Sequence, residues 1–167
     1  GTAEATEATR YEETKEKVLP WIVETSAGID RVLLALLVHA YTEEEVSVGG
    51  GAGRGTGESR TVLKLPRRLA PVQVAVFPLL TNKEPLVAKA RAIAKDLRLL
   101  FRVQYDDAGA VGRRYRRQDE IGTPFCVTVD HATIENDTVT VRERDAMTQE
   151  RVGVQALPAR LQELFAA

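Results

Sequence analysis

Apolar and polar positions follow two different spacings along this chain, and these spacings predict its elements. Apolar positions recurring every three to four residues, together with one very polar segment, predict helices over Ser26–Tyr41, Lys83–Leu99, Ala110–Glu120 and Leu157–Phe165. Short alternating or continuous apolar runs predict strands over Val18–Val23, Val72–Phe77, Phe101–Tyr105, Pro124–Val129, Thr138–Arg144 and Gln149–Val154. Ser26 is the predicted N-cap of the first helix, since its hydroxyl suits that position.

The order of elements after residue 61 predicts the fold class. Strand, helix, strand, helix and strand are followed by two more strands and a helix, which is typical of a mixed sheet with helices on both faces. We therefore predict an α/β domain over residues 61–167, with a five-stranded mixed sheet flanked by helices. Segment 43–60 is rich in glycine and charge, and this predicts a flexible linker. Its GGGAGRGTGES run lacks the GK[ST] ending of a phosphate-binding loop.

Composition and charge exclude several classes of protein. With a formal net charge of −1, any contact with nucleic acid must come from a local patch rather than a global basic field. A single cysteine, Cys126, excludes an internal disulfide framework, and its apolar surroundings predict a buried thiol. His39 and His131 lack metal-ligand spacing. No apolar run is long enough to span a membrane and no signal segment is evident, so we expect a cytoplasmic protein without a membrane partner.

A small group of polar residues surrounds the predicted strand-to-helix turn at Glu24-Thr-Ser-Ala-Gly-Ile-Asp-Arg31. Glu24, Ser26 and Arg31 bring an acid, a hydroxyl and a guanidinium to one helix start. Taken alone, Glu24 is equally well a surface acid and Ser26 a helix cap. Only about 23 residues precede this turn, too few to build the other walls of a pocket, so the turn has the character of one edge of a larger site.

Two further polar clusters lie in the predicted α/β domain. The first surrounds Tyr115 and contains Arg113, Arg114, Arg116, Arg117, Asp119 and Glu120. It is either a solvated helix face with pairs such as Arg116–Asp119, or a surface for phosphate and base edges, which arginine binds in a bidentate manner. The second contains Arg142, Glu143, Arg144, Asp145, Gln149 and Arg151. Strand alternation places Arg142 and Arg144 on one face of a half-exposed strand. Acids and arginines together match the donor and acceptors of cytosine.

These residues resemble a known family. ETSAGIDR followed by an apolar helix is similar to the third signature motif of class II aminoacyl-tRNA synthetases, in the form found in homodimeric glycyl-tRNA synthetases. LAPVQVAVFPL, YDDAGAVGRRYRRQDEIGTPFCVTVD and DTVTVRERDAMTQERV resemble the anticodon-binding domain of the same family. The resemblance covers about residues 11–167. It implies that 1–42 is the end of a catalytic domain, joined by the 43–60 linker to an anticodon-binding domain at 61–167.

The resemblance also implies roles for individual residues. Arg31, with Gly28, would bind ATP, while Glu24 and Ser26 would hold the glycine substrate. The residues implied to contact glycine tRNA are Arg142, Arg144, Asp145, Gln149, Arg116 and Arg117. The full enzyme would be a homodimer that uses ATP and Mg²⁺ to join glycine to its tRNA, with no DNA partner.

The first two class II motifs do not occur in this sequence, so we expect the chain to be either part of a longer enzyme or a degenerate relative of that enzyme. We expect it to hold no cofactor by itself, to bind glycine tRNA weakly and not to aminoacylate it. The alternative is a stand-alone RNA- or protein-binding module that reuses the anticodon-binding fold without catalysis. The intact ETSAGIDR motif argues against that alternative, because a binding module has no use for an ATP-binding arginine.

Overall fold

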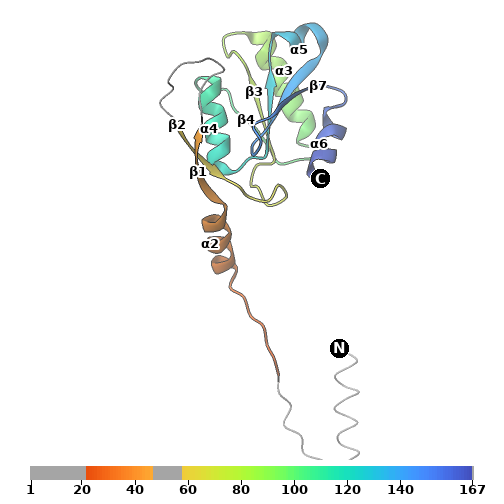
Figure 1. The fold of residues 1–167 in the computed structure, drawn as a ribbon. Helices are drawn as coiled ribbons and strands as arrows, with labels where there is room; N and C mark the ends of the chain where they lie inside the picture. The colour runs from red at the N-terminus through yellow and green to blue at the C-terminus, as the bar shows by residue number, and fades with distance from the viewer. Residues whose placement is uncertain (1–21, 47–57, 167) are drawn as a thin grey trace, which may run out of the picture. The chain divides into compact units, whose positions relative to one another are not determined.

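The computed structural model describes residues 22–46 and 58–166 (Figure 1). Its contacts divide the chain into two units, residues 1–32 and 33–167, with the boundary inside helix α2 (Ile29–Ala40). This helix begins three residues after the predicted N-cap, and the carbonyl of Gly28, rather than Ser26, accepts the first helical hydrogen bond, from the Val32 N–H at 3.1 Å. The predicted strand Val18–Val23 is not present in its described part, residues 22–23, and residues 18–21 lie outside the described range.

The second unit contains the predicted mixed sheet. Its strands are β3 (Val74–Pro78), β4 (Val103–Tyr105), β5 (Phe125–Val129), β6 (Thr138–Glu143) and β7 (Gln149–Gly153). They lie in the order β4-β3-β5-β6-β7. Strand β3 runs parallel to β4 and β5, whereas β6 is antiparallel to both β5 and β7. The five-stranded α/β prediction is therefore confirmed, and β7 is an edge strand of the sheet.

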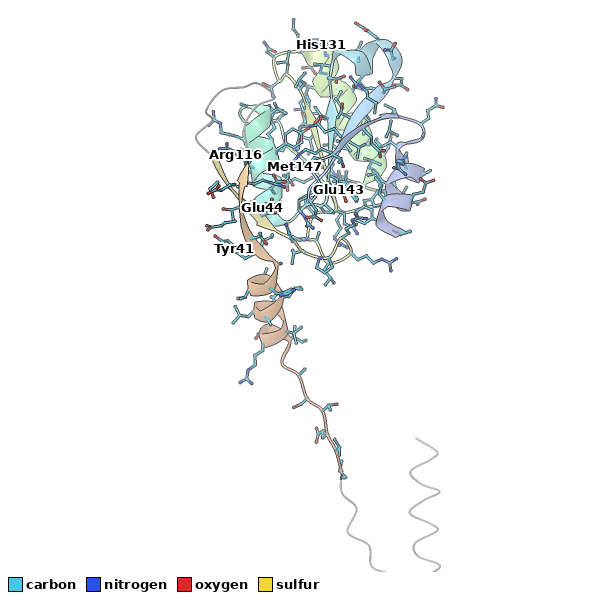
Figure 2. All side chains as sticks on the ribbon, viewed as in Figure 1. Tyr41, Glu44, Arg116, His131, Glu143 and Met147 are labelled. Carbon is cyan, nitrogen blue, oxygen red and sulfur yellow. The ribbon has the colours of Figure 1, made fainter. Side chains whose placement is uncertain are left out.

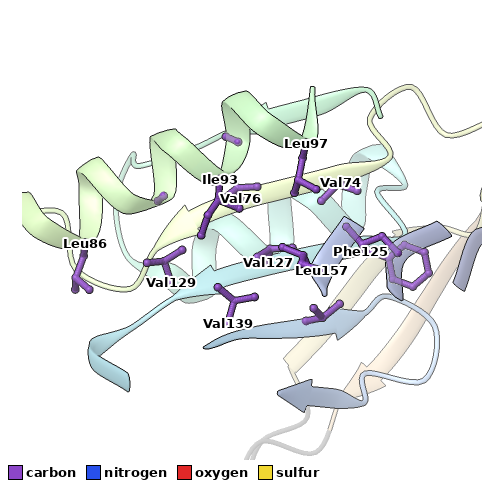
Figure 3. Packing of buried hydrophobic residues seen from close by; sticks show 14 residues of the cluster. Val74, Val76, Leu86, Ile93, Leu97, Phe125, Val127, Val129, Val139 and Leu157 are labelled. Carbon is purple, nitrogen blue, oxygen red and sulfur yellow. The ribbon is translucent and has the colours of Figure 1, made fainter. Parts of the chain in front are cut away.

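Helices cover both faces of this sheet. On one face, α3 (Glu84–Leu97) and α6 (Leu157–Ala166) pack on the main core, in which Ile93 and Leu97 contribute from α3 and Leu161 from α6. Figure 3 shows the α3 side chains directed at the valines of the strands. On the other face, α4 (Val111–Ile121) packs Tyr115 against a smaller cluster in β3 and β5. No helix in residues 22–46 and 58–166 has the length and apolar character needed to cross a membrane.

A short helix, α5 (His131–Asn136), was not predicted. It follows β5 directly, and a capping box fixes its start: the Thr133 N–H donates to the Asp130 carboxylate while the Thr133 hydroxyl accepts from the Asp130 N–H. These reciprocal hydrogen bonds satisfy the backbone N–H groups of Asp130 and Thr133 at the helix start. A six-residue helix is too short to show apolar periodicity in the sequence. The capping residues Asp130 and Thr133 are therefore the sequence signal that could have predicted it.

The predicted linker 43–60 is wrong at both ends. Strands β1 (Tyr41–Val46) and β2 (Glu58–Leu63) form an antiparallel hairpin in which Tyr41 pairs with Leu63 and Glu44 pairs with Arg60. Within this segment, residues 47–57, which contain all of its glycines, lie outside the described range. The ends of the segment are too polar to resemble strands, and they fold because β2 packs on α4. The hairpin is thus part of the α/β unit rather than a flexible connection.

Candidate nucleic-acid interface

A buried ion cluster joins the hairpin, α4 and β6. The carboxylate of Asp119 accepts hydrogen bonds from Arg60 Nε at 2.8 Å and from Arg142 Nη1 at 3.1 Å. The Arg142 guanidinium also lies over the Tyr115 ring, 4.9 Å from its centroid. Burial lowers the pKa of Arg142, but its hydrogen bonds and ion pair with Asp119 outweigh this and leave the pKa above its ordinary value. The charged form of Arg142 is therefore favoured, and the cluster holds three elements together.

Arg144 is the centre of a second internal network. Its side chain is 3% exposed and donates to the carbonyls of Gly122 at 2.8 Å and Leu65 at 3.0 Å. It also forms a bidentate pair with Asp145, at 2.8 and 2.9 Å. Partial burial raises the pKa of Asp145, yet the hydrogen bonds and charge of Arg144 lower it more, so the carboxylate is favoured. Every nitrogen of Arg144 has a partner inside the domain.

These two networks correct the prediction that Thr138–Arg144 is a half-exposed strand. Arg142 is buried on the face that α4 covers, and Arg144 lies beyond the end of β6 in the turn to β7. Both guanidinium groups are held within the domain, so they shape the surface instead of presenting free donors to it. The predicted alternation of apolar and polar residues is present in β6, but the sequence alone does not reveal that α4 covers the polar face of this strand.

The arginines of α4 also differ from one another. Arg114 is buried and donates to the carbonyls of Pro78 and Gly109, whereas Arg116 is exposed. Arg117 is partly exposed and binds Asp106 through Nε at 3.1 Å and Nη2 at 2.6 Å. Of the predicted tRNA-binding residues on this helix, Arg116 is thus the one that projects from the domain, and it is labelled in Figure 2.

The turn from β6 to β7 is the exposed feature nearest these networks. Asp145, Met147 and Gln149 are exposed, and the turn is closed by a 3.0 Å hydrogen bond from the Glu143 N–H to the Thr148 carbonyl. Met147 has a φ of 54°, a left-handed conformation that is uncommon outside glycine, and it is labelled in Figure 2. Strand register places Gln149 opposite Arg142, on the sheet face that α4 partly covers. An exposed polar turn thus lies next to the buried networks of Arg142 and Arg144.

The residues predicted to bind glycine and ATP lie in a different part of the chain. Glu24 and Ser26 are exposed in the irregular segment 22–28, and Arg31 is exposed in the first turn of α2. Within the described residues, no hydrogen bond or ion pair joins the three side chains. Their joint role therefore stays a prediction.

Sequence reasoning missed Arg60 because it lay in the predicted linker. It also treated Asp119 as a surface acid, although Asp119 is the central acceptor of the cluster. The sequence QDEIG, residues 118–122, contains one signal for the end of α4. Gly122, which follows α4, has a φ of 82° and closely approaches the Leu63 carbonyl. A glycine directly after a helix predicts such a left-handed end and therefore a tight turn beside Asp119.

Comparison with known proteins shows to which class of protein this fold belongs. The chain resembles part of a solved prolyl-tRNA synthetase from Cryptosporidium parvum, which is complexed with L-proline and AMP. The TM-score is 0.59 and the identity 25%, and the match covers 63% of this chain and 24% of that chain. The sequence model described as "Anticodon binding domain" matches residues 73–164, from β3 into α6. The chain therefore belongs to the anticodon-binding domain family, with the fold found in class II aminoacyl-tRNA synthetases.

Similar curated proteins indicate which synthetase this domain resembles, because they are glycine–tRNA ligases. The relative from Thermobifida fusca is 50% identical over 155 residues, covering 93% of this chain and 32% of the relative. The relative from Streptomyces coelicolor is 52% identical over 143 residues, covering 86% and 30%. The relative from Borreliella burgdorferi is 51% identical over 144 residues, again covering 86% and 30%. The predicted resemblance to glycyl-tRNA synthetase is confirmed, and the chain spans about a third of the length of these relatives.

Proposed function

We propose that this chain is the C-terminal part of a glycine–tRNA ligase and that its five-stranded domain binds the anticodon region of glycine tRNA. The observation that carries the proposal is the extent of the similarity. It covers 93% of the chain, so it includes residues 24–31 as well as the sheet. In the complete enzyme, ATP and Mg²⁺ would support glycine activation, and the enzyme would act as a homodimer.

The exposed β6–β7 turn and the neighbouring α4 surface are the proposed contact region for tRNA. Asp145 and Gln149 offer acceptors and donors to unpaired base edges, and Arg116 offers a planar cation for phosphate or for stacking. Arg142 and Arg144 are assigned a positioning role, because their guanidinium groups are occupied by Asp119, Asp145 and backbone carbonyls. Arg117 contributes through its exposed edge while Asp106 fixes its orientation.

The proposed contribution to catalysis comes from the segment before α2. The Arg31 guanidinium can bind two phosphate oxygens of ATP at once, and its place in the first helical turn adds the positive end of the helix dipole. A Cβ atom added at Gly28, just before the helix, would meet only the Arg31 side chain at ordinary contact distance, so the backbone here is uncrowded. The Glu24 carboxylate suits the ammonium group of glycine, and Ser26 can donate to or accept from the same substrate.

Two experiments test the proposal. The first measures binding of the 167-residue chain to glycine tRNA and to the same tRNA with its anticodon cytosines replaced, over a range of salt concentrations. Base recognition predicts a preference that persists as salt weakens phosphate contacts. Equal affinities at every salt concentration would overturn the anticodon assignment.

The second experiment replaces the matching third of the Thermobifida fusca relative with this chain. The hybrid enzyme is expected to exchange pyrophosphate into ATP in a glycine-dependent manner, and Arg31→Lys should weaken this exchange because lysine lacks the bidentate fork. An active hybrid that is indifferent to Arg31→Lys and Arg31→Ala would contradict the role of Arg31. Lys64→Met, a change in an exposed ion pair, serves as the matched control.

A further inference from the structure

A groove runs around the end of α6, beside the segment 66–73 that leads from β2 to β3 (Figure 1). It consists of two hollows of about 370 and 420 Å³, which share Arg68, Phe165 and Ala166. Each volume lies within the range of ligand sites, about 300–1,000 Å³. Gln73 and Phe101 line the first hollow and lie just before β3 and β4, so the groove reaches the β4 edge of the sheet. The β6–β7 turn belongs to the opposite edge.

The floor of the groove is aromatic and is held in place by other rings. Phe165 stacks on Phe101, with 5.4 Å between the ring centroids, and meets Phe125 edge to face at 5.0 Å. Phe101 and Phe165 are only half-buried, and Leu100, which also lines the groove, is 53% exposed. A floor that is already ordered binds an apolar side chain without losing much conformational entropy.

Two more leucines extend this apolar surface beyond the groove. Leu69 follows Arg68 in the chain and is 58% exposed, and Leu99 precedes Leu100 and is 85% exposed. Exposed apolar residues gathered around a hollow are typical of a surface that binds another protein. A phosphate backbone offers nothing apolar to cover them. The leucines therefore favour a peptide over a nucleic acid.

The surroundings of the groove are basic, although the whole chain has a formal net charge of −1. Segments 66–73 and 95–102 contain one acid, Asp96, and five basic residues, which are Arg67, Arg68, Lys95, Arg98 and Arg102. No acid is among the residues that line the two hollows. Such a rim attracts a carboxylate and repels another basic surface.

Arg68 is the arginine of the groove that is available to a ligand. Arg67 is held by the Leu164 carbonyl at 2.6 Å, and Arg102 donates to the carbonyls of Arg68 and Ala70 at 3.0 and 2.8 Å. The Arg68 side chain is exposed, and none of the described residues forms a hydrogen bond or an ion pair with it. Its guanidinium can therefore bind both oxygens of an incoming carboxylate.

We propose that this groove docks an acidic segment of another protein that carries a bulky apolar side chain beside its carboxylates. The apolar side chain packs on Phe165 and Leu100, and a neighbouring carboxylate binds Arg68. The side-chain amides of Gln73 and Gln162 line the same hollow and hydrogen-bond the backbone of the peptide. The inference goes beyond the proposed function and does not depend on it, because it requires no RNA.

The test measures the fluorescence anisotropy of the labelled peptide EEDLEFLDE on addition of the 167-residue chain. Two matched peptides separate the two parts of the site: EEDSESSDE lacks the apolar side chains, and QQNLQFLNQ lacks the charges. We expect EEDLEFLDE to bind and each matched peptide to bind at least about tenfold more weakly. Equal binding of either matched peptide, or no binding of EEDLEFLDE, would overturn the inference.

Variants of the chain locate the binding surface. Arg68→Glu should weaken binding of EEDLEFLDE about tenfold, whereas Arg113→Glu, the same charge reversal at an exposed residue of α4, should not. Leu100→Ser should weaken it about fivefold, whereas Ile134→Ser should not. Ile134 lies on α5 and is 51% exposed, nearly the same as Leu100. Thermal unfolding verifies that the variants are folded, and equal effects of a variant and its control would place the peptide elsewhere and overturn the inference.

Two further measurements decide between possible occupants of the groove. A stem-loop carrying the glycine anticodon should bind the wild-type and Arg68→Glu chains alike. If Arg68→Glu weakens the stem-loop more than the peptide, the groove is an RNA surface and the inference is overturned. The hybrid enzyme should bind EEDLEFLDE as the 167-residue chain does, and a hybrid that does not bind it would show that the rest of the enzyme covers the groove. If the peptide binds at Arg68 while the stem-loop shows no base preference, the inference stands and the proposed function fails.

Discussion

Arg60 on β2 and Asp119 on α4 form a buried ion pair, with Arg60 Nε 2.8 Å from Asp119 Oδ2 and both side chains at most 6% exposed. The pair connects the hairpin that follows α2 with the helix that packs beneath the candidate interface. Because Asp119 also binds Arg142 of β6, one carboxylate holds two cations from different elements. The hairpin therefore cannot move away from the α/β unit without exposing or unpairing buried charge.

This arrangement predicts unequal costs for removing its members. Asp119→Asn leaves the buried Arg142 guanidinium without a counter-charge and leaves Arg60 with Glu44 alone. We expect it to lower the free energy of unfolding by about 3–5 kcal/mol. Arg60→Met leaves Asp119 still bound to Arg142, so we expect a smaller loss of about 1–3 kcal/mol. Urea unfolding measures both.

The control for this prediction is the exposed pair between Lys89 and Asp137, which shares no residue with the cluster. The two side chains are 35% and 50% exposed, and Lys89→Met should change stability by only about 0–1 kcal/mol. Equal losses for Lys89→Met and Asp119→Asn would show that the buried cluster does not stabilise the domain more than a surface pair does.

Gly122 gives a second prediction. A Cβ atom at this position would lie 2.8 Å from the Leu63 carbonyl oxygen, and its φ of 82° already disfavours a side chain. Gly122→Ala should destabilise the domain by about 1–3 kcal/mol. Gly112→Ala on the same helix is the matched control. Nothing lies within 4 Å of its added Cβ atom, so it should be neutral or stabilise by up to about 1 kcal/mol in thermal unfolding.

The sequence predicted the sheet well because its strands are strongly patterned. β3 and β5 are buried along their whole length, and runs such as Phe125–Val129 are almost entirely apolar. The β1–β2 hairpin has no such pattern. Its stability comes from Arg60, whose partners are up to 84 residues away, and no local rule connects residues so distant in sequence.

The candidate interface was predicted less well for the same reason. The arginine-rich segments are candidates because of their chemistry, but the burial of each arginine depends on which helix covers which face of the sheet. Arg142 and Gln149 lie opposite one another in the sheet, yet one is buried beneath α4 and the other is exposed. Alternation predicts a shared face, whereas the position of α4 above that face follows only from the assembled fold.

Cys126 gives a third prediction, based on pH. Burial raises the pKa of its thiol to about 12, from the ordinary value of 9.0 expected in an unfolded chain. Below pH 9 the thiol is protonated in both states and has no effect on the pH dependence of stability. Above pH 9 the unfolded chain ionises first, so this contribution to stability falls by about 1.4 kcal/mol per pH unit until the folded thiol also ionises.

The measurement for Cys126 compares the wild-type chain with Cys126→Ala in urea at pH 8 and pH 10.5. The wild-type chain should lose more stability between these two values than the variant, since other ionising groups are common to both. Iodoacetamide at pH 8 should modify Cys126 only after unfolding. Rapid modification of the folded chain, or the same pH dependence in both proteins, would contradict the burial of this thiol.

The last prediction separates residues that shape the interface from those that contact RNA. Arg144→Ala removes donors to the Gly122 and Leu65 carbonyls, so it should lower the melting temperature as well as weaken binding to the anticodon stem-loop. Gln149→Ala removes an exposed amide without a side-chain partner among the described residues. It should leave the melting temperature unchanged and weaken stem-loop binding by about 1–3 kcal/mol.

Comparing the two variants at a temperature where both are folded gives the decisive result. Fluorescence anisotropy measures the affinity and thermal unfolding measures the stability. If Arg144→Ala weakens binding without any loss of stability, then Arg144 must leave its internal partners and read a base directly, as the sequence first indicated. If only Gln149→Ala has a selective effect on binding, the buried arginine holds the turn while the exposed amide contacts the RNA. The four side-chain hydrogen bonds of Arg144, to Gly122, Leu65 and Asp145, favour the second result, because direct readout would have to break them first.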